Sequence, residues 1–442
     1  MGAEVLTQPA PRATARAPRR QRLPPFWLLA LVAALLLASS ATLDTQDVNE
    51  YHCYALAFWH GAHAAATLEA ADLCLTPASS FSSLPFHTLP TEYGPLALLT
   101  FTPPLIFPAD WYNLAFFVEM TMVALAIAWL LRRFGAYGAG HVWLMYALLG
   151  ANMLTGGRFD VAPAACVVVA IIASQRGRRS WAYVALAVGT LLKLYPLALL
   201  PLLLIESWRA REREPLWRGP TLFAAIIVAV EGLAATVAPA GLLGPLGFMG
   251  ARCVQVESVP ATFSSLWANY LHAQPQFPYA FNSTCEQAPG MGSAQMIALA
   301  LGLAGIALTI TLFWRQRITL GVAALLIIGS LIVGSKVFSP QYLLWLSPLV
   351  AMEYGAEALP LIGWSMVCLL TTLCFPFAYN GTLSGYFNRS PVTMIVLTAG
   401  ARNLLLLALG GAVLWRRARA ARQPDETGAL PVAAGSQTGD TP

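Results

Sequence analysis

Charged residues are scarce in this chain of 442 residues. Asp, Glu, Lys and Arg make up only 11% of it, whereas 57% is hydrophobic. A soluble domain carries about 25% charged residues, so this composition excludes an ordinary soluble domain and indicates a membrane protein. Lysine is the scarcest charged residue, because Lys193 and Lys336 are the only lysines among 26 basic residues.

Several functional motifs are also missing. The chain has no Walker loop and no glycine-rich GxGxxG bounded by a strand, which argues against a nucleotide site. The spacing of His52, His60 and His63 matches no zinc signature. We therefore expect no metal, no other cofactor and no nucleic-acid partner.

What is present is a series of apolar runs separated by arginine clusters at 132–133, 176–179, 209–218, 315–317 and 416–422. The positive-inside rule places these clusters in the cytoplasm, with an even number of crossings between successive clusters. The pattern predicts an all-α polytopic bundle of about 12 transmembrane helices (11–13), with both termini inside. A full crossing needs roughly 20 residues, and several of these runs are shorter.

The same pattern divides the chain. We predict disordered cytoplasmic tails at 1–25 and 416–442, a transmembrane domain at 26–415, and outer loops at about 43–93, 240–293 and 377–390. The run from Phe26 to Ala41 is interpreted as an uncleaved first span, although its "ASSA" end would also suit a signal peptide. The segment 94–108, split by Pro103 and Pro104, is predicted to be a short or re-entrant helix. Broken helices are expected beside Lys193 and after Gln341.

The first outer loop is rich in polar residues. It begins "LDTQDVNEYHCYALAFWHG", which places Asp44 and Asp47 directly after a span. Aspartates in this position either cap a helix N-terminus or act as a general base. The pattern from Tyr54 to Ala66 favours one amphipathic helix lying on the membrane.

Five motifs occur in a recognisable order: "DVNEY", "EYGPL", "GRFD", "LLKLYPLALLPLLL" and "KVFSPQYLLWLSPL". In this order the chain, over about 26–415, resembles polytopic glycosyltransferases of the GT-C class. It is most similar to family 87, whose members resemble polyprenol-phosphate-mannose-dependent mannosyltransferases. It departs from that pattern at Tyr93-Gly94-Pro95, where such proteins often show "YPP".

The resemblance implies a GT-C-like bundle whose non-cytoplasmic first loop carries the catalytic carboxylate. The donor would be a sugar on a polyprenyl phosphate, and the acceptor a hydroxyl of a lipid or glycan. Mannose is the implied sugar, while arabinose or another hexose stays open. The competing class is a polytopic transporter or a lipid or glycan flippase without transferase activity. The chain shows no repeat of the segments around Lys193 and Lys336 that would favour that class.

Phosphate is a good leaving group, so this chemistry needs one carboxylate and cations but no general acid. Asp47 is the predicted base because of its spacing to Tyr51, and Asp44 is the alternative. Lys193 and Lys336, with Tyr195 beside Lys193, are the predicted ligands of the donor phosphate. Alternatively, each lysine only extends to the lipid headgroups.

Other polar residues outside the cytoplasm are candidates for substrate binding: Glu92, Tyr51, Arg158, Asp160, Gln341, Arg252 and His272. Arg158 and Asp160 would alternatively pair with each other at a hairpin tip. Arg402 lies within a span, where we expect pairing to a buried partner rather than catalysis, although the sequence does not identify that partner.

Cysteine positions agree with an outer compartment. Cys53 and Cys74 share the first loop, and Cys253 and Cys285 share the long loop, so each pair could form a disulfide in an oxidising environment. We expect a multi-pass protein of a bacterial plasma membrane, in contact with membrane lipid, with its active site on the non-cytoplasmic face.

Overall fold

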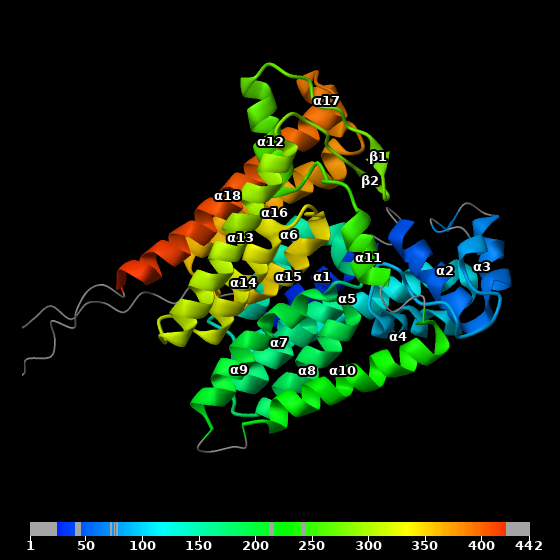
Figure 1. Ribbon diagram of the computed structural model, residues 1–442, viewed down its shortest axis with the longest axis horizontal. Coiled ribbons are helices and arrows are strands. Elements are labelled where there is room, and N and C mark those ends of the chain that lie inside the picture. The colour runs from blue at the N-terminus through cyan, green and yellow to red at the C-terminus, as the bar shows by residue number, and fades with distance from the viewer. Residues whose placement is uncertain are drawn as a thin grey trace, which may run out of the picture.

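The computed structural model describes residues 24–39, 46–70, 73–74, 76, 78–211, 216–239 and 244–420. The described chain is mostly helical, as predicted, with a single short β-ribbon (Figure 1). Asp44 and most of both predicted tails lie outside the described residues. The helix α18 continues to Ala420, past the expected boundary at 415.

The first half of the chain contains these elements: α1 (Phe26–Ser39), α2 (Gln46–His60), α3 (Ala62–Glu69), η2 (Ala78–Ser80), η3 (Pro95–Ala97), α4 (Leu98–Phe101), η4 (Pro103–Ile106), η5 (Ala109–Trp111), α5 (Tyr112–Phe134), α6 (Ala139–Gly157), α7 (Val161–Gln175), α8 (Arg179–Leu192), η6 (Tyr195–Leu199) and α9 (Leu200–Arg209). The second half contains α10 (Arg218–Val237), α11 (Gly244–Ala251), α12 (Val259–Tyr270), β1 (Tyr279–Ala280), β2 (Ser283–Thr284), α13 (Met291–Trp314), α14 (Leu320–Gly334), η8 (Pro340–Tyr342), α15 (Leu343–Tyr354), α16 (Ala358–Thr372), η9 (Leu373–Ala378), α17 (Thr382–Phe387) and α18 (Pro391–Ala420).

Five described helical segments are long and apolar enough to cross a membrane: Ala109–Phe134, Arg218–Val237, Met291–Trp314, Ala358–Ala378 and Pro391–Arg417. Shorter apolar helices accompany them, including α7 and α14. Only helices can span lipid here, because each satisfies its own backbone hydrogen bonds. The membrane character is thereby supported, while the total of about 12 spans stays a prediction.

The central core is formed by helices that pack on several sides. α1 lies against α5 and α6, and α15 lies against α6, α7 and α14. Trp143 of α6 is completely buried there, and its indole N–H donates to the carbonyl of Ala124 at 2.9 Å. The predicted first span is therefore an integral part of the bundle.

The break predicted beside Lys193 is present, whereas the helix after Gln341 is short but continuous. α8 ends at Leu192 because Lys193 takes an extended conformation and Pro196 follows it. Pro340 likewise starts the short turn η8 before α15, and 94–108 forms only short helical turns. The single helix expected from Tyr54 to Ala66 is wrong. The chain breaks at Gly61, which has φ +80° and packs so tightly on the Ser83 carbonyl that a side chain would clash.

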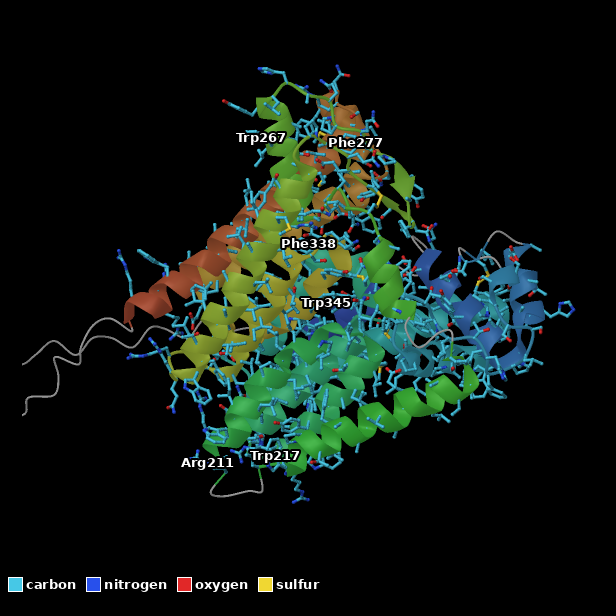
Figure 2. All side chains as sticks on the ribbon, viewed as in Figure 1. Arg211, Trp217, Trp267, Phe277, Phe338 and Trp345 are labelled. Atoms are coloured by element: carbon cyan, nitrogen blue, oxygen red, sulfur yellow. A yellow bond between two sulfur atoms is a disulfide. The ribbon has the colours of Figure 1, made fainter. Side chains whose placement is uncertain are left out.

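The arginine-rich turns meet at one end of the bundle. The Arg132 guanidinium lies over the Phe26 ring at 4.7 Å, and Arg176 lies over Phe134 at 4.9 Å. Arg209 donates to the carbonyls of Phe313 and Trp314, which joins the α9–α10 turn to the end of α13. Figure 2 shows Arg211 and Trp217 at this lower edge, away from α2, α3 and α12 in Figure 1.

This arrangement yields a topology test. Leu84 in the first loop and Leu194 beside Lys193 are 58% and 47% exposed, and Trp217 on the arginine-rich side is 69% exposed. We expect cysteine at 84 and at 194 to react with an impermeant thiol reagent added outside intact cells. Cysteine at 217 should react only after permeabilisation, because the positive-inside rule predicts that the arginine-rich side faces the cytoplasm. The reverse labelling pattern would contradict the topology.

Candidate functional site

The end of the bundle opposite the arginine-rich turns brings separated motifs together. Asp47 lies in the first turn of α2, and Arg158 directly follows α6. Their side chains form an ion pair in which Asp47 is 26% exposed and Arg158 is 16% exposed. The carboxylate is therefore held in a fixed direction while it stays accessible from outside.

A second ion pair lies beside the first in the chain. Asp160, two residues after Arg158, is buried and accepts from the Lys193 ammonium at 2.7 Å. The same carboxylate oxygen accepts from the Trp345 indole N–H at 2.7 Å. The idea that Arg158 and Asp160 pair with each other is thus wrong, since each has a different partner. Lys193 is 15% exposed and anchored inward, which does not fit a lysine that merely extends to the headgroups.

Aromatic rings enclose the Lys193 ammonium. Its nitrogen lies 5.2 Å from the ring centres of Phe159 and Trp345, 5.5 Å from that of Tyr93 and 5.8 Å from that of Tyr342. Cation–π attraction within about 6 Å favours a charged ammonium at a partly desolvated position. The site therefore holds an ammonium, paired with Asp160, in low-dielectric surroundings, where a contact to an anion is stronger than in water.

Tyr195 is part of this arrangement. Its ring stacks on that of Trp345 at 4.1 Å, and Trp345 stacks on Tyr342 at 3.9 Å. The Tyr195 hydroxyl is buried without a hydrogen-bond partner. The motifs "KLYP" and "FSPQYLLW" thus form one stack of three rings beside Lys193. We call this stack of Tyr195, Trp345 and Tyr342 the aromatic wall.

Gly94 joins the "EYGPL" motif to the Lys193 motif. Its N–H donates to the carbonyl of Leu192, which the end of α8 leaves free, at 3.2 Å. A Cβ at position 94 would lie only 2.1 Å from the Leu191 carbonyl oxygen. A proline here would lose this hydrogen bond and collide with α8, which explains the glycine in place of "YPP".

Glu92 and Arg252 extend the charge cluster. Burial raises the pKa of the Glu92 carboxyl, Arg252 opposes that rise, and Asp47 adds to it. Arg252 also lies within electrostatic reach of Tyr342. The loop at 240–293 therefore comes close to the first loop and to the ring of Tyr342.

Helix α2 is held firmly beneath Asp47. Tyr51 is buried, stacked on Phe101 at 4.4 Å, and touches the rings of Tyr93 and Phe159. The disulfide between Cys53 and Cys74 ties α2 to the rest of the first loop, the pairing that their shared loop had suggested. Tyr51 therefore supports α2 from within the core, where the sequence had suggested substrate contact.

His52 makes α2 sensitive to acid. It is buried and stacked on Tyr112 at 3.8 Å, and burial lowers its pKa from 6.5 to about 4. Between these pH values the unfolded chain binds a proton that the folded chain does not, so the free energy of unfolding falls as the pH falls. The full loss is roughly 3 kcal/mol. We expect His52→Phe to weaken the dependence of the unfolding temperature on pH between pH 6.5 and 4. An unchanged dependence on pH would contradict this assignment.

The other predicted residues are more dispersed. The Lys336 ammonium donates to the Gly250 carbonyl of α11 at 2.8 Å, which places it beside the loop that carries Arg252. Gln341 is half-buried in η8. His272 is exposed just beyond the C-terminus of α12, whose end carries Trp267 near the top of Figure 2, well above Trp345 in that view. Within the described residues, no group of three or more His, Cys, Asp or Glu could hold a metal.

A comparison with protein families identifies the family of this chain. The model of glycosyltransferase family 87 matches residues 91–340, more than half of the chain. The chain belongs to glycosyltransferase family 87. No curated protein matches it. The matched range of this family 87 glycosyltransferase contains Arg158, Asp160 and Lys193 but not Asp47, whose place in the site depends on its ion pair with Arg158.

Sequence reasoning missed important parts of the site of this membrane glycosyltransferase. Trp345 and Phe159 look like ordinary apolar residues of their segments, yet both face Lys193. Glu257, the buried partner of Arg402, lies in the loop at 240–293, away from Lys193, and nothing in its sequence context identifies it. A carboxylate beside the N-cap of a helix gives no sign of such pairing.

Proposed function

We propose that this family 87 glycosyltransferase moves mannose from a polyprenyl-phosphate donor to a hydroxyl of a lipid- or glycan-type acceptor on the non-cytoplasmic face. The observation that carries the proposal is the convergence of two ion pairs, Asp47 with Arg158 and Asp160 with Lys193, at the end opposite the arginine-rich turns. They supply an accessible carboxylate and partly buried cations, which are the groups that this transfer needs.

In the proposed step the acceptor hydroxyl oxygen attacks the anomeric carbon of the sugar. The bond between that carbon and the phosphate oxygen breaks, and the electron pair leaves with the polyprenyl phosphate. The hydroxyl proton passes to the Asp47 carboxylate. The Arg158 guanidinium favours the ionised form of Asp47, which is the form that accepts a proton.

Lys193 would stabilise the departing phosphate. Of its three N–H donors one is used by Asp160, and the surrounding rings are not competing acceptors of full strength. Lys336 lies next to the loop that carries Arg252, which interacts electrostatically with Glu92, and both cations would add contacts to the donor. A lysine contacts phosphate as a point charge, without the paired geometry that arginine favours.

The disulfides support the proposed face. Cys53–Cys74 lies in the first loop, and Cys253–Cys285 lies in the long loop beside Arg252. Disulfides persist in oxidising compartments and are rare in the cytosol. Both loops, and therefore the site between them, are best placed outside the cytoplasm.

The decisive experiment uses membranes that contain the full chain and a polyprenyl-phosphate mannose with radiolabelled sugar. We expect label to pass to a lipid or glycan acceptor. Labelled mannose supplied on a nucleotide should give no transfer. Parallel donors carrying arabinose or another hexose test the sugar. Transfer directly from the nucleotide sugar, or no transfer from any polyprenyl-phosphate sugar, would overturn the proposal.

A further inference from the structure

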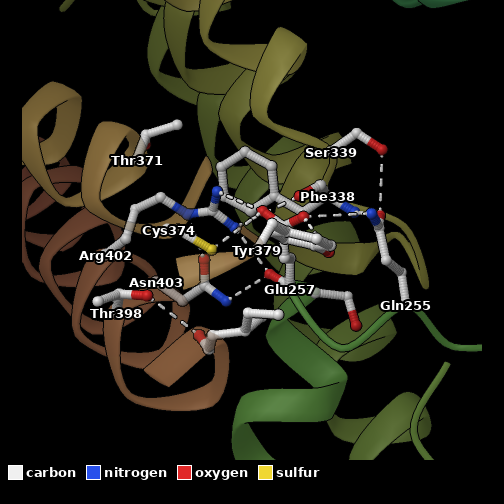
Figure 3. Close-up of polar contacts among 12 residues, drawn as sticks. Gln255, Glu257, Phe338, Ser339, Thr371, Cys374, Tyr379, Thr398, Arg402 and Asn403 are labelled. Carbon is white, nitrogen blue, oxygen red and sulfur yellow. Dashed lines mark hydrogen bonds and ion pairs between the residues drawn. The ribbon is translucent and has the colours of Figure 1, made fainter. Parts of the chain in front are cut away.

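A fully buried ion pair lies away from the ion pairs of Asp47 and Lys193. Glu257 and Arg402 are 1% and 0% exposed, and the Arg402 guanidinium donates to the Glu257 carboxylate at 3.2 Å and to its backbone carbonyl at 2.8 Å. The Tyr379 hydroxyl donates to the same carboxylate at 2.9 Å (Figure 3). Apolar side chains can often replace a buried ion pair without loss of stability, so stability alone does not explain this one.

Gln255 connects the pair to the segment that precedes η8. Its side-chain N–H donates to the Glu257 carboxylate at 3.4 Å. Its side-chain oxygen accepts from the Phe338 N–H at 3.1 Å and from the Ser339 hydroxyl at 3.2 Å (Figure 3). Its own backbone N–H donates to the Lys336 carbonyl at 2.9 Å. Gln255 thus forms hydrogen bonds with three residues of this segment, Lys336, Phe338 and Ser339.

Arg402 contacts the same segment, at Phe338. Its guanidinium lies over the Phe338 ring at 3.8 Å and donates to the Phe338 carbonyl at 3.4 Å. The network therefore joins α18, the long outer loop and the "KVFSP" motif. Figure 2 places Phe338 close to Trp345 near the middle of the molecule.

The segment 336–339 is followed in the chain by Tyr342 and Trp345 of the aromatic wall. Phe338 stacks toward Tyr342 at 6.2 Å, and Tyr342 stacks on Trp345 at 3.9 Å. Trp345 in turn binds Asp160, the partner of Lys193. Because Pro340 and the short turn η8 leave little freedom between Ser339 and Tyr342, a shift of the segment would move both rings.

We infer that Gln255, anchored by the buried Glu257–Arg402 pair, is a positioning residue that sets Tyr342 and Trp345 against Lys193. The part of this inference that concerns donor phosphate rests on the proposed function. Gln255 touches neither ring and acts on them through its hydrogen bonds to Phe338 and Ser339.

A first test needs no substrate. A cysteine at Gln341, half-buried within η8, reports on the order of the segment through its rate of reaction with an impermeant thiol reagent. We expect Gln255→Ala to accelerate this reaction roughly tenfold, the scale expected when buried hydrogen bonds are lost.

Thr262→Val is the matched control. The Thr262 hydroxyl donates to the Ser258 carbonyl at 3.2 Å and accepts from the Asn403 side chain at 2.9 Å, so its loss loosens the network on the side away from Phe338. We expect it to lower the unfolding temperature comparably and to leave the reaction rate at 341 nearly unchanged. Equal acceleration in both variants, or in neither, would overturn the inference.

A second test measures transfer in a double-mutant cycle of Gln255→Ala with Trp345→Phe. If Gln255 acts through the aromatic wall, its effect on kcat/KM shrinks markedly once Trp345 is replaced. Additive effects would contradict a positioning role. Should the wild-type chain fail to use polyprenyl-phosphate mannose, the proposed function fails, while the thiol test still decides the role of Gln255.

Discussion

Asp47→Asn is expected to lower the transfer rate by about 10²–10⁴, because the amide cannot accept the proton of the acceptor hydroxyl. Asparagine is nearly isosteric, and its oxygen can still accept from Arg158, so α2 should keep its place. The measurement is the initial rate of mannose transfer, normalised to the amount of folded protein. A variant with full turnover would remove Asp47 from the mechanism.

The companion variant is Asp44→Asn, which changes the alternative carboxylate outside the described residues. We expect it to keep most of the transfer rate. If Asp44→Asn abolishes transfer and Asp47→Asn does not, Asp44 is the base. If neither variant affects transfer, the mechanism with an aspartate base is wrong.

Loss of the Lys193 ammonium should be the second large effect. Removing one preorganised electrostatic group typically lowers kcat by about 10²–10³. Lys193→Met alone is a poor test, because it leaves the buried Asp160 without its cation and costs about 3–5 kcal/mol of stability.

The better comparison removes the counter-charge in both variants. Asp160→Asn keeps the ammonium, and Asp160→Asn combined with Lys193→Met lacks it, while the substituted amide oxygen could still accept from the Trp345 indole. We expect the double variant to transfer about 10²–10³ times more slowly than the single one. Equal rates would show that Lys193 serves only to pair Asp160.

Lys336→Met provides an internal reference. Lys336 contacts the Gly250 carbonyl and has no acidic partner among the described ion pairs, so this variant should fold normally. The KM for the donor is compared between this variant and the Lys193 variants. The comparison separates the effect of the Lys336 charge on donor binding from the effect of the Lys193 charge.

The sequence alone determined the membrane character, the family and the identity of the main motifs. Low charge and apolar runs follow from the need to bury helices in lipid, and they are local properties of the chain. The break beside Lys193 was also predictable, because Pro196 restricts its own backbone. The cysteine pairs were suggested by their loops alone, and the structure confirms both disulfides.

Only the tertiary structure decided which charges meet. Asp47 and Arg158 come from elements far apart in the sequence, as do Glu257 and Arg402. Their pairing depends on how α2 sits against α6 and how the long loop sits against α18, which no local pattern encodes. The structure also gave Lys193 a buried counter-ion and surrounded it with rings from three other segments. A buried charge requires a partner, but the packing of the helices chooses that partner.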